Sequence, residues 1–264
     1  MKIAFIGAGN MAGAIMRGMC RNSFAGADIS AYDIDSDKTA ALAEEWGVIA
    51  AGTSEAAIQD SDAVVLAVKP QMFARVLPPL KEILRQERPL IISIAAGKTL
   101  ADIAAMVGDD HALVRVMPNI CATVGTAVSA YTGNAQVTNE QKQLVVRIFD
   151  AVGRTMELEE RYFSVFSAVA SCSPAFTLLY IESLAQAGVK HGLPKAKALE
   201  IASQAVLGTA KLLQETGAHP HVLMDSVCSP GGTTIEGVCA LQRNGLEAAV
   251  IAAVDASLEK DKKL

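Results

Sequence analysis

The stretch Lys2-Ile3-Ala4-Phe5-Ile6-Gly7-Ala8-Gly9-Asn10-Met11-Ala12 decides the fold of the amino-terminal half. Its apolar, β-favouring opening predicts a strand, and the spacing of Met11, Ile15 and Met19 predicts a helix that begins directly after the glycines. A strand, a tight glycine turn and a helix in this order are typical of a dinucleotide-binding unit.

Each small residue of the turn has a physical role in that interpretation. Gly7 supplies the turn, Gly9 lets a pyrophosphate approach the backbone, and Ala12 lets the helix pack close to the strand. The phosphates then lie at the helix N-terminus, where free N–H groups favour an anion. Because strand and helix flank the glycines, we favour a dinucleotide site over a purely structural turn. The predicted cofactor-binding residues are Ile6, Gly7, Ala8, Gly9, Asn10, Met11 and Ala12.

Length and composition restrict the class of protein. The 264 residues suffice for one large or two modest domains, and no uninterrupted apolar run reaches membrane-spanning length, which predicts a soluble protein. No export signal precedes the first strand, so we expect a cytoplasmic location. The five cysteines form no C-x-x-C pair, which favours reduced thiols over disulfides or a metal site. A net charge of −5 without a basic cluster argues against nucleic acid or a membrane as partner.

The second predicted strand, residues 28–33, ends in an acid. Asp33 lies about twenty residues beyond the glycine turn, where this fold places the group that binds the adenosine ribose. The alternative is an ordinary aspartate that caps the next helix, a role that Asp35 or Ser36 fills equally well.

Three further predicted strands end in small or turn-forming residues. Strand 62–68 is followed by Pro70, strand 90–94 by Ala95-Ala96-Gly97, and strand 113–116 by Met117-Pro118-Asn119. Ligands bind at the carboxyl ends of parallel strands. The three loops therefore predict a cofactor crevice beside the glycine turn, although each taken alone is also an ordinary strand-to-helix connection.

Near Glu159 the pattern changes from strands to long helices. We therefore predict a doubly wound α/β (Rossmann-type) domain over 1–158 and an all-helical dimerisation and substrate domain over 159–264. The helical half includes helices over 174–191 and 195–215, and residues 259–263 are expected to form a solvated tail. Its broad apolar faces exceed what a small bundle can hide, so we expect them to pack against a second copy of the chain.

One late segment, Ser229-Pro230-Gly231-Gly232-Thr233-Thr234, offers a chemical site. Consecutive N–H groups on a tight turn before a helix can hold a small carboxylate, with a hydroxyl beside it. A glycine-rich connection between helices is the equally plausible alternative. The histidines near it lack a third ligand for a metal, and Cys172 lacks an identifiable base.

Taken together, these motifs resemble the Δ1-pyrroline-5-carboxylate reductase family over nearly the whole chain. The matching segments are residues 5–12, 67–70, 93–97, 117–119, 185–190 and, most specifically, 225–236. The resemblance implies hydride transfer from NADPH or NADH to the C=N of pyrroline-5-carboxylate, giving L-proline. It also implies a homodimer with interleaved helices, often assembled into a ring of dimers, in which the Ser229–Thr234 turn faces the partner's cofactor.

The resemblance assigns roles by position. The Thr234 hydroxyl is implied to hydrogen-bond the substrate nitrogen and is the catalytic candidate, while Thr233 and the preceding glycines offer N–H groups to the carboxylate. The implied substrate-binding residues are Glu160, Ser226, Ser229, Gly231, Gly232, Thr233 and Thr234. The implied additional cofactor-binding residues are Asp33, Ser54, Val68, Lys69, Pro70, Ala95 and Asn119, the last near the nicotinamide.

Two departures from the family pattern matter. Residues 171–176 read Ser-Cys-Ser-Pro-Ala-Phe where many members read Gly-Ser-Gly-Pro-Ala-Tyr. Asp33 stands where a small polar residue often receives the 2′-phosphate of NADP, and its charge favours NADH, so we expect both cofactors to be used.

Two other functions stay open at this point. One is a related reductase of another cyclic imine or of a 3-hydroxy acid, which needs a helix-borne lysine such as Lys190. The other is a non-catalytic NAD(P)-sensing protein.

Overall fold

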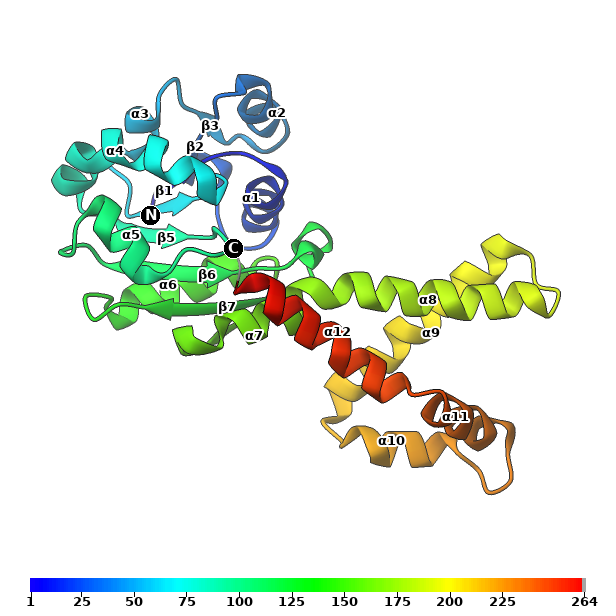
Figure 1. Ribbon diagram of the computed structural model, residues 1–264. Helices are drawn as coiled ribbons and strands as arrows, with labels where there is room; N and C mark the ends of the chain where they lie inside the picture. Colours follow the sequence, from blue (N-terminus) through cyan, green and yellow to red (C-terminus); the bar gives the residue numbers. More distant parts are fainter. Residues whose placement is uncertain (263–264) are drawn as a thin grey trace. The chain divides into compact units, whose positions relative to one another are not determined.

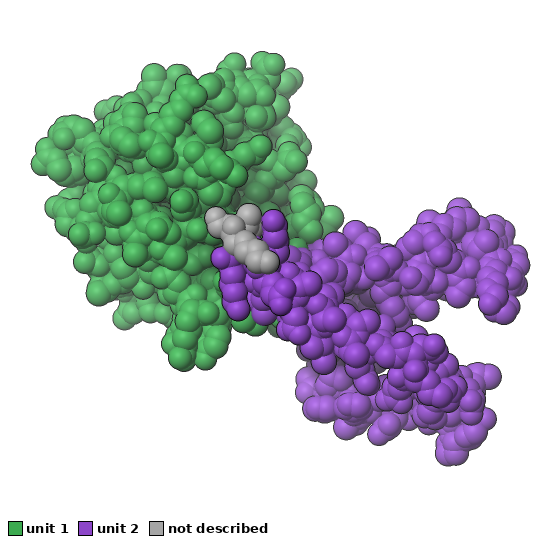
Figure 2. Space-filling model, in the orientation of Figure 1, with its two compact units in different colours: residues 1–171, 264 green, residues 172–263 purple. Residues whose placement is uncertain are grey.

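The computed structural model describes residues 1–262 of the chain. The chain divides into two compact units, one over residues 1–171 and the other from Cys172 onward, coloured separately in Figure 2. The domain boundary predicted at 158/159 lies upstream of this division and stays a prediction.

A mostly parallel sheet forms the centre of the first unit, and within the described residues its strand order is β3-β2-β1-β4-β5-β6-β7-β8 (Figure 1). The strands are β1 Ile3–Ile6, β2 Ile29–Tyr32, β3 Ile49–Ala50, β4 Ala63–Leu66, β5 Leu90–Ser93, β6 Leu113–Met117, β7 Ala127–Gly133 and β8 Gly153–Glu157. Among these neighbouring pairs, β6 and β7 are antiparallel, and the other pairs, including β7 and β8, are parallel. The order 3-2-1-4-5-6 confirms the predicted doubly wound fold.

Helices cover both faces of this sheet. They are α1 Asn10–Asn22, α2 Ser36–Trp46, α3 Ser54–Ile58, α4 Phe73–Glu87, α5 Leu100–Val107 and α6 Asn139–Asp150. On one face Phe5 packs with Met16 of α1 and Ile148 of α6; on the other Ile6 packs with Phe73 of α4. Because alternate residues of β1 enter two different cores, the strand has to be apolar throughout, as its sequence is.

Two glycines permit close approach in the first unit. Gly7 has φ +104°, and a Cβ there would lie 2.8 Å from the carbonyl oxygen of Ala67, at the end of β4. At Gly18 of α1 a Cβ would lie 2.2 Å from Cγ1 of Val152. Gly18 therefore lets α1 approach residues 151 and 152 closely.

From Glu160 the chain is almost entirely helical. A short 3₁₀ turn (η4, Glu160–Tyr162) and α7 (Phe163–Phe166) lead into a π-helical turn (η5, Ser167–Cys172) and then α8 (Ser173–Lys190). The remaining helices are α9 Lys195–Thr216, α10 Pro220–Val227, α11 Thr233–Arg243 and α12 Leu246–Asp261, and further 3₁₀ turns are η1 Gly26–Asp28, η2 Pro70–Met72 and η3 Ile120–Val124.

One local prediction was wrong in part. The tail expected over 259–263 is helical through Asp261, as the last turn of α12; Lys263 lies outside the described residues.

The second unit has little core of its own. Ala185 of α8 packs against Ala198 and Ala202 of α9. Figure 1 shows α9 crossing behind α8. Large apolar side chains remain exposed on its helices, including Leu178, Leu179, Leu184, Ile201, Leu207, Val222, Val227, Val250 and Ile251. So much exposed apolar surface is typical of a protein–protein interface.

The continuous helical stretch Glu160–Lys190 passes a length-and-composition test for a membrane span, although the sequence holds no uninterrupted apolar run of that length. Its 31 residues contain a window long and apolar enough to cross a membrane, by length and composition alone. Serines interrupt this window, which is why no uninterrupted apolar run was found in the sequence. An apolar helix that packs against another chain has the same composition.

Candidate active site

A cavity of about 390 Å³ lies at the carboxyl ends of the central strands of the first unit, and we call it the strand-edge cavity. It is lined by Met11, Ala67, Val68, Lys69, Pro70, Ile94, Ala95, Ala96, Met117, Pro118, Asn119, Ile120, Ser167 and Ser171. The three loops that follow β4, β5 and β6 therefore meet at one place beside α1. The cavity contains six predicted cofactor residues: Met11, Val68, Lys69, Pro70, Ala95 and Asn119.

The glycine loop, Gly7–Gly9, presents an open helix N-terminus. Gly9 is the N-cap of α1 and provides no side-chain cap, and its carbonyl accepts the Gly13 N–H at 2.8 Å. The amides of Asn10, Met11 and Ala12 precede that first helical bond, so the helix leaves them free for a ligand. A Cβ built on Gly9 meets no atom within 4 Å, so the space above the loop is open. These features suit a pyrophosphate.

The carboxylate of Asp33 is held by the glycine loop. Its Oδ2 accepts the Ala8 N–H at 2.7 Å, its Oδ1 accepts the Asp35 N–H at 3.0 Å, and Nζ of Lys38 lies 3.5 Å from Oδ1. Burial alone raises the pKa of Asp33, but the hydrogen bonds from Ala8 and Asp35 and the charge of Lys38 lower it below its usual value overall. Asp33 is thus ionised and fixes the loop; its predicted contact with a ribose stays a prediction.

Asn119 joins β7 to the π-helical turn. Its Nδ2 donates to the carbonyl oxygen of Ala170 at 2.9 Å, and its Oδ1 accepts the Val128 N–H at 3.3 Å. The side chain is buried in the wall of the strand-edge cavity, with 7 % of the residue exposed. Its amide therefore shapes the cavity wall through main-chain contacts.

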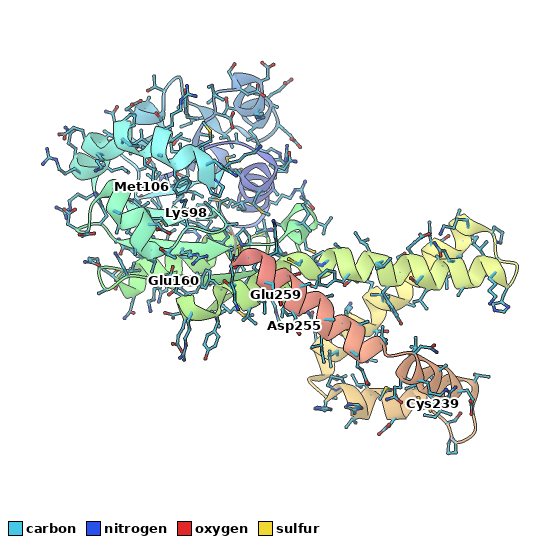
Figure 3. All side chains as sticks on the ribbon, viewed as in Figure 1. Lys98, Met106, Glu160, Cys239, Asp255 and Glu259 are labelled. Atoms are coloured by element: carbon cyan, nitrogen blue, oxygen red, sulfur yellow. The ribbon has the colours of Figure 1, made fainter. Side chains whose placement is uncertain are left out.

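Glu160, labelled in Figure 3, anchors the start of the long helical stretch to the sheet. Its Oε1 accepts two hydrogen bonds, one from the Leu100 N–H at 2.8 Å and one from Nη1 of the buried Arg115 at 3.1 Å. The guanidinium of Arg115 also lies over the ring of Phe163, 4.6 Å from its centre. Glu160 does not line the strand-edge cavity, and its predicted contact with substrate stays a prediction.

The late glycine turn, Ser229–Thr234, lies in the second unit. Gly231 has φ +66°, and the Gly232 N–H donates to the Ser229 carbonyl at 3.0 Å. Gly232 is the N-cap of α11 and provides no side-chain cap, so the amides of the following turn are free; Thr233 and Thr234 are exposed there. This is the backbone arrangement that the predicted carboxylate nest requires.

Two serines that the resemblance assigned to the site make hydrogen bonds to residues close in sequence. The Ser226 hydroxyl donates to the Leu223 carbonyl at 2.7 Å within α10, and the Ser54 hydroxyl lies 3.1 Å from Oε2 of Glu55 at the start of α3. Neither lines the strand-edge cavity, so both assignments stay predictions.

Both units contain segments that match models of known protein families. Residues 160–264 match the family model described as pyrroline-5-carboxylate reductase dimerisation, and residues 2–97 match the model described as NADP oxidoreductase coenzyme F420-dependent. The pyrroline-5-carboxylate reductase of Escherichia coli is 40 % identical over 264 residues, which cover 100 % of this chain and 98 % of that protein. The chain belongs to the pyrroline-5-carboxylate reductase family.

Solved structures of pyrroline-5-carboxylate reductases share the fold. The one from Coxiella burnetii has a TM-score of 0.96 at 33 % identity, over 99 % of this chain and 97 % of that chain. The one from Plasmodium falciparum, which has NADP bound, has a TM-score of 0.87 at 30 % identity, over 100 % and 97 %.

In this family member, the predicted residues fall into two groups. The first unit holds the predicted cofactor residues and Glu160, and the second holds Ser226 and the late glycine turn. Sequence reasoning missed Ser167 and Ser171, which line the strand-edge cavity from the π-helical turn. Pro174 is the signal that could have found them: it has no N–H for the carbonyl four residues earlier, at Ala170.

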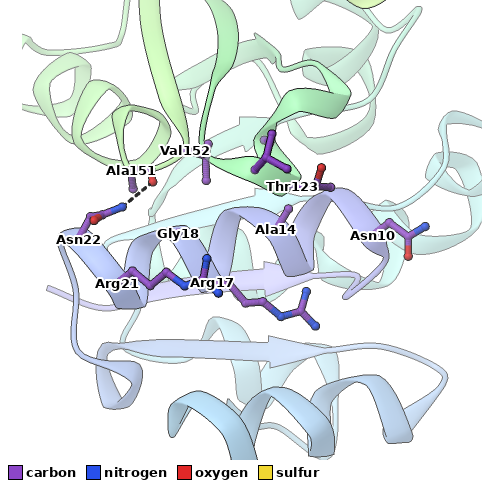
Figure 4. A pocket seen from close by; sticks show the side chains of 12 residues that line it. Asn10, Ala14, Arg17, Gly18, Arg21, Asn22, Thr123, Ala151 and Val152 are labelled. Carbon is purple, nitrogen blue, oxygen red and sulfur yellow. Dashed lines mark hydrogen bonds between the residues drawn. The ribbon is translucent and has the colours of Figure 1, made fainter. Parts of the chain in front are cut away.

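A second cavity, of about 300 Å³, lies between α1 and residues 122–125 and 151–152 (Figure 4). Arg17 and Arg21 line it, but Arg17 is paired with Glu45 at 3.5 Å, and Arg21 lies over the ring of Trp46. Of the predicted site residues it contains only Asn10. Its arginines thus already have protein partners.

Among residues 1–262, no three His, Cys, Asp or Glu side chains lie close enough to hold a metal ion. His219 accepts the His221 N–H through Nδ1 at 3.3 Å, and the two rings stack. Their role in the described chain is to begin α10.

Proposed function

We propose that this chain reduces Δ1-pyrroline-5-carboxylate to L-proline with NAD(P)H. The observation that carries the proposal is the match to a reductase of this name over both units, at 40 % identity. The alternatives, a 3-hydroxy-acid reductase and a cofactor sensor, are separated from it by the assay below.

The first unit fits a dinucleotide. Three features lie at the same edge of the sheet: the uncapped N-terminus of α1, the open space above Gly9 and the strand-edge cavity. The amides of residues 10–12 would hold the pyrophosphate, and the apolar loops after β4 and β5 would exclude water from the nicotinamide. The cofactor, when bound, supplies a hydride to the C=N carbon of the imine.

We assign the substrate to the late glycine turn. Free N–H groups at the start of α11 suit a carboxylate, and we assign the hydrogen bond to the ring nitrogen to the hydroxyl of the exposed Thr234. A protonated cyclic imine is already electrophilic, so orientation and a single hydrogen bond suffice in place of a strong acid. We further propose that this turn serves the cofactor bound by a partner chain.

We propose a homodimer as the working form, with dimers able to assemble into a ring, in the cytoplasm. The exposed leucines, isoleucines and valines of α8, α9 and α12 support the dimer, because a monomer would leave them in water. Mass measurement in solution tests the number of copies.

One assay tests the function. Purified protein is mixed with NADH or NADPH, and oxidation of the cofactor is followed at its absorbance band after pyrroline-5-carboxylate is added. We expect oxidation that depends on the imine and falls at least tenfold in Thr234→Ala, with Lys190→Ala as the control that stays active. Loss of activity in Lys190→Ala with a 3-hydroxy acid as substrate would favour that alternative, and cofactor binding without turnover would favour the sensor.

A further inference from the structure

The π-helical turn at Ser167–Cys172 has a local cause. The carbonyl of Ala170 would normally accept the N–H four residues on, but residue 174 is proline and has none. The side chain of Asn119 supplies the missing donor, at 2.9 Å. A buried asparagine thus stabilises the widened turn, and turns of this kind are frequent at functional sites.

The widened turn changes the surroundings of Ser171. Elsewhere in the chain, helical hydroxyls donate to the carbonyl four residues earlier at 2.8 to 2.9 Å, as at Ser183, Thr209, Thr216 and Ser257. The Ser171 Oγ makes no such bond, and it is buried without any hydrogen-bond partner among the described residues. An unpaired buried hydroxyl is unfavourable, by an amount comparable to a lost hydrogen bond.

Ser171 is also part of the strand-edge cavity wall. The other lining side chains are mostly apolar (Met11, Val68, Pro70, Ile94, Ala95, Met117), and Nδ2 and Oδ1 of Asn119 are both bonded to main chain. Lys69 and Ser167 are the remaining polar side chains of the wall. Ser171 as a residue is half-buried, and rotation about χ1 is the freedom that its hydroxyl has to meet a ligand.

We propose that Ser171 orients the nicotinamide ring of the cofactor by donating a hydrogen bond from its hydroxyl to the ring's carboxamide oxygen. A mostly apolar slot with a buried, unpartnered hydroxyl in its wall matches an aromatic ring that carries one polar substituent. The cavity is built from first-unit residues next to the glycine loop, which favours the cofactor over the substrate as the acceptor. This inference rests on the proposed function, because it requires a nicotinamide dinucleotide.

The test compares ligands that differ only at the ring. Dissociation constants of Ser171→Ala and the unchanged protein are measured for NAD(P)H, for its thionicotinamide analogue, whose sulfur is a weaker acceptor, and for ADP-ribose, which lacks the ring. Ser164→Ala is the matched control, since Ser164 is exposed on the same helical stretch and does not line the cavity.

We expect Ser171→Ala to raise the dissociation constant of NAD(P)H about three- to tenfold, the effect of one ordinary hydrogen bond. Binding of ADP-ribose stays unchanged, and the preference for the carboxamide over the thioamide disappears. Equal binding of NAD(P)H by both proteins, or an equal loss for ADP-ribose, overturns the proposal.

Two other outcomes are distinguishable. If Ser171→Ala changes only the KM for the imine, the hydroxyl serves the substrate and the proposal is wrong. If the unchanged protein binds no dinucleotide, both the proposed function and the proposal for Ser171 are wrong. Thermal unfolding of each variant shows whether the fold itself has changed.

Discussion

The carboxylate of Asp33 accepts the backbone N–H of Ala8 at 2.7 Å, so the acid at the end of β2 fixes the glycine loop at the end of β1. Sequence reasoning assigned Asp33 to the adenosine ribose, and with it the discrimination between cofactors. The structure adds a second, because removing the side chain also removes an acceptor from the loop.

Substitutions at Asp33 separate these two tasks. Asp33→Asn removes the charge but keeps an acceptor for Ala8, whereas Asp33→Ser removes both. We expect both variants to shift the preference toward NADPH by about tenfold, because a negative charge near the 2′-phosphate is lost. Only Asp33→Ser should also weaken the binding of NADH, because only this variant loses the acceptor that holds the loop. The measurement is the ratio of dissociation constants for the two cofactors; an unchanged ratio in both variants would remove Asp33 from cofactor choice.

Asn119 is expected to contribute stability as well as shape. Asn119→Ala leaves the Ala170 carbonyl and the Val128 N–H without their partner, at a cost of about 2–4 kcal/mol for one buried and one partly buried group. Thermal unfolding followed by circular dichroism should show a clear decrease in midpoint. Thr123→Ala is the control, since that hydroxyl bonds only to the exposed end of η3. A midpoint equal to that of the control would mean that the π-helical turn does not depend on Asn119.

The sequence was sufficient to predict β1, β4, β5 and β6 because each is a short apolar run followed within a few residues by glycine or proline. Those signals are local, and so is the glycine-rich start of α11. The engagement of Asp33 by Ala8 and of Glu160 by Arg115 was not predictable, since each joins residues far apart in sequence. Ser171 was missed because one widened helical turn decides its surroundings, and helical periodicity assumes regular turns.

His111 makes stability depend on pH. It is buried, and burial lowers its pKa, a shift that nearby Asp110 opposes and Arg88 reinforces. Between about pH 6.5, where an unfolded histidine titrates, and the lower folded pKa, the unfolded chain binds the extra proton, so stability falls as pH falls. His111→Gln should flatten the pH dependence of the unfolding midpoint in this range. A slope equal to that of the unchanged protein would contradict this account of His111.

Glu160 can be tested for structure and for substrate binding at once. Glu160→Ala removes the partner of buried Arg115 and the acceptor of the Leu100 N–H. We expect a loss of about 1–3 kcal/mol, less than for a fully buried pair because the Glu160 side chain is 32 % exposed. Glu160→Gln retains an acceptor for Leu100 and should lose less.

The kinetic arm of this experiment decides between the two roles of Glu160. If the carboxylate only anchors the helix, Glu160→Gln changes the unfolding midpoint and leaves the KM for the imine as it was. If it also binds the substrate, as the family resemblance implies, the KM rises in Glu160→Gln at temperatures where the variant is fully folded. The control is an isosteric change at Asp102. Its carboxylate accepts the Thr99 N–H at the start of α5, the helix that begins at Leu100. Asp102→Asn should lower stability without any effect on KM, because its carboxylate completes only the capping box of that helix.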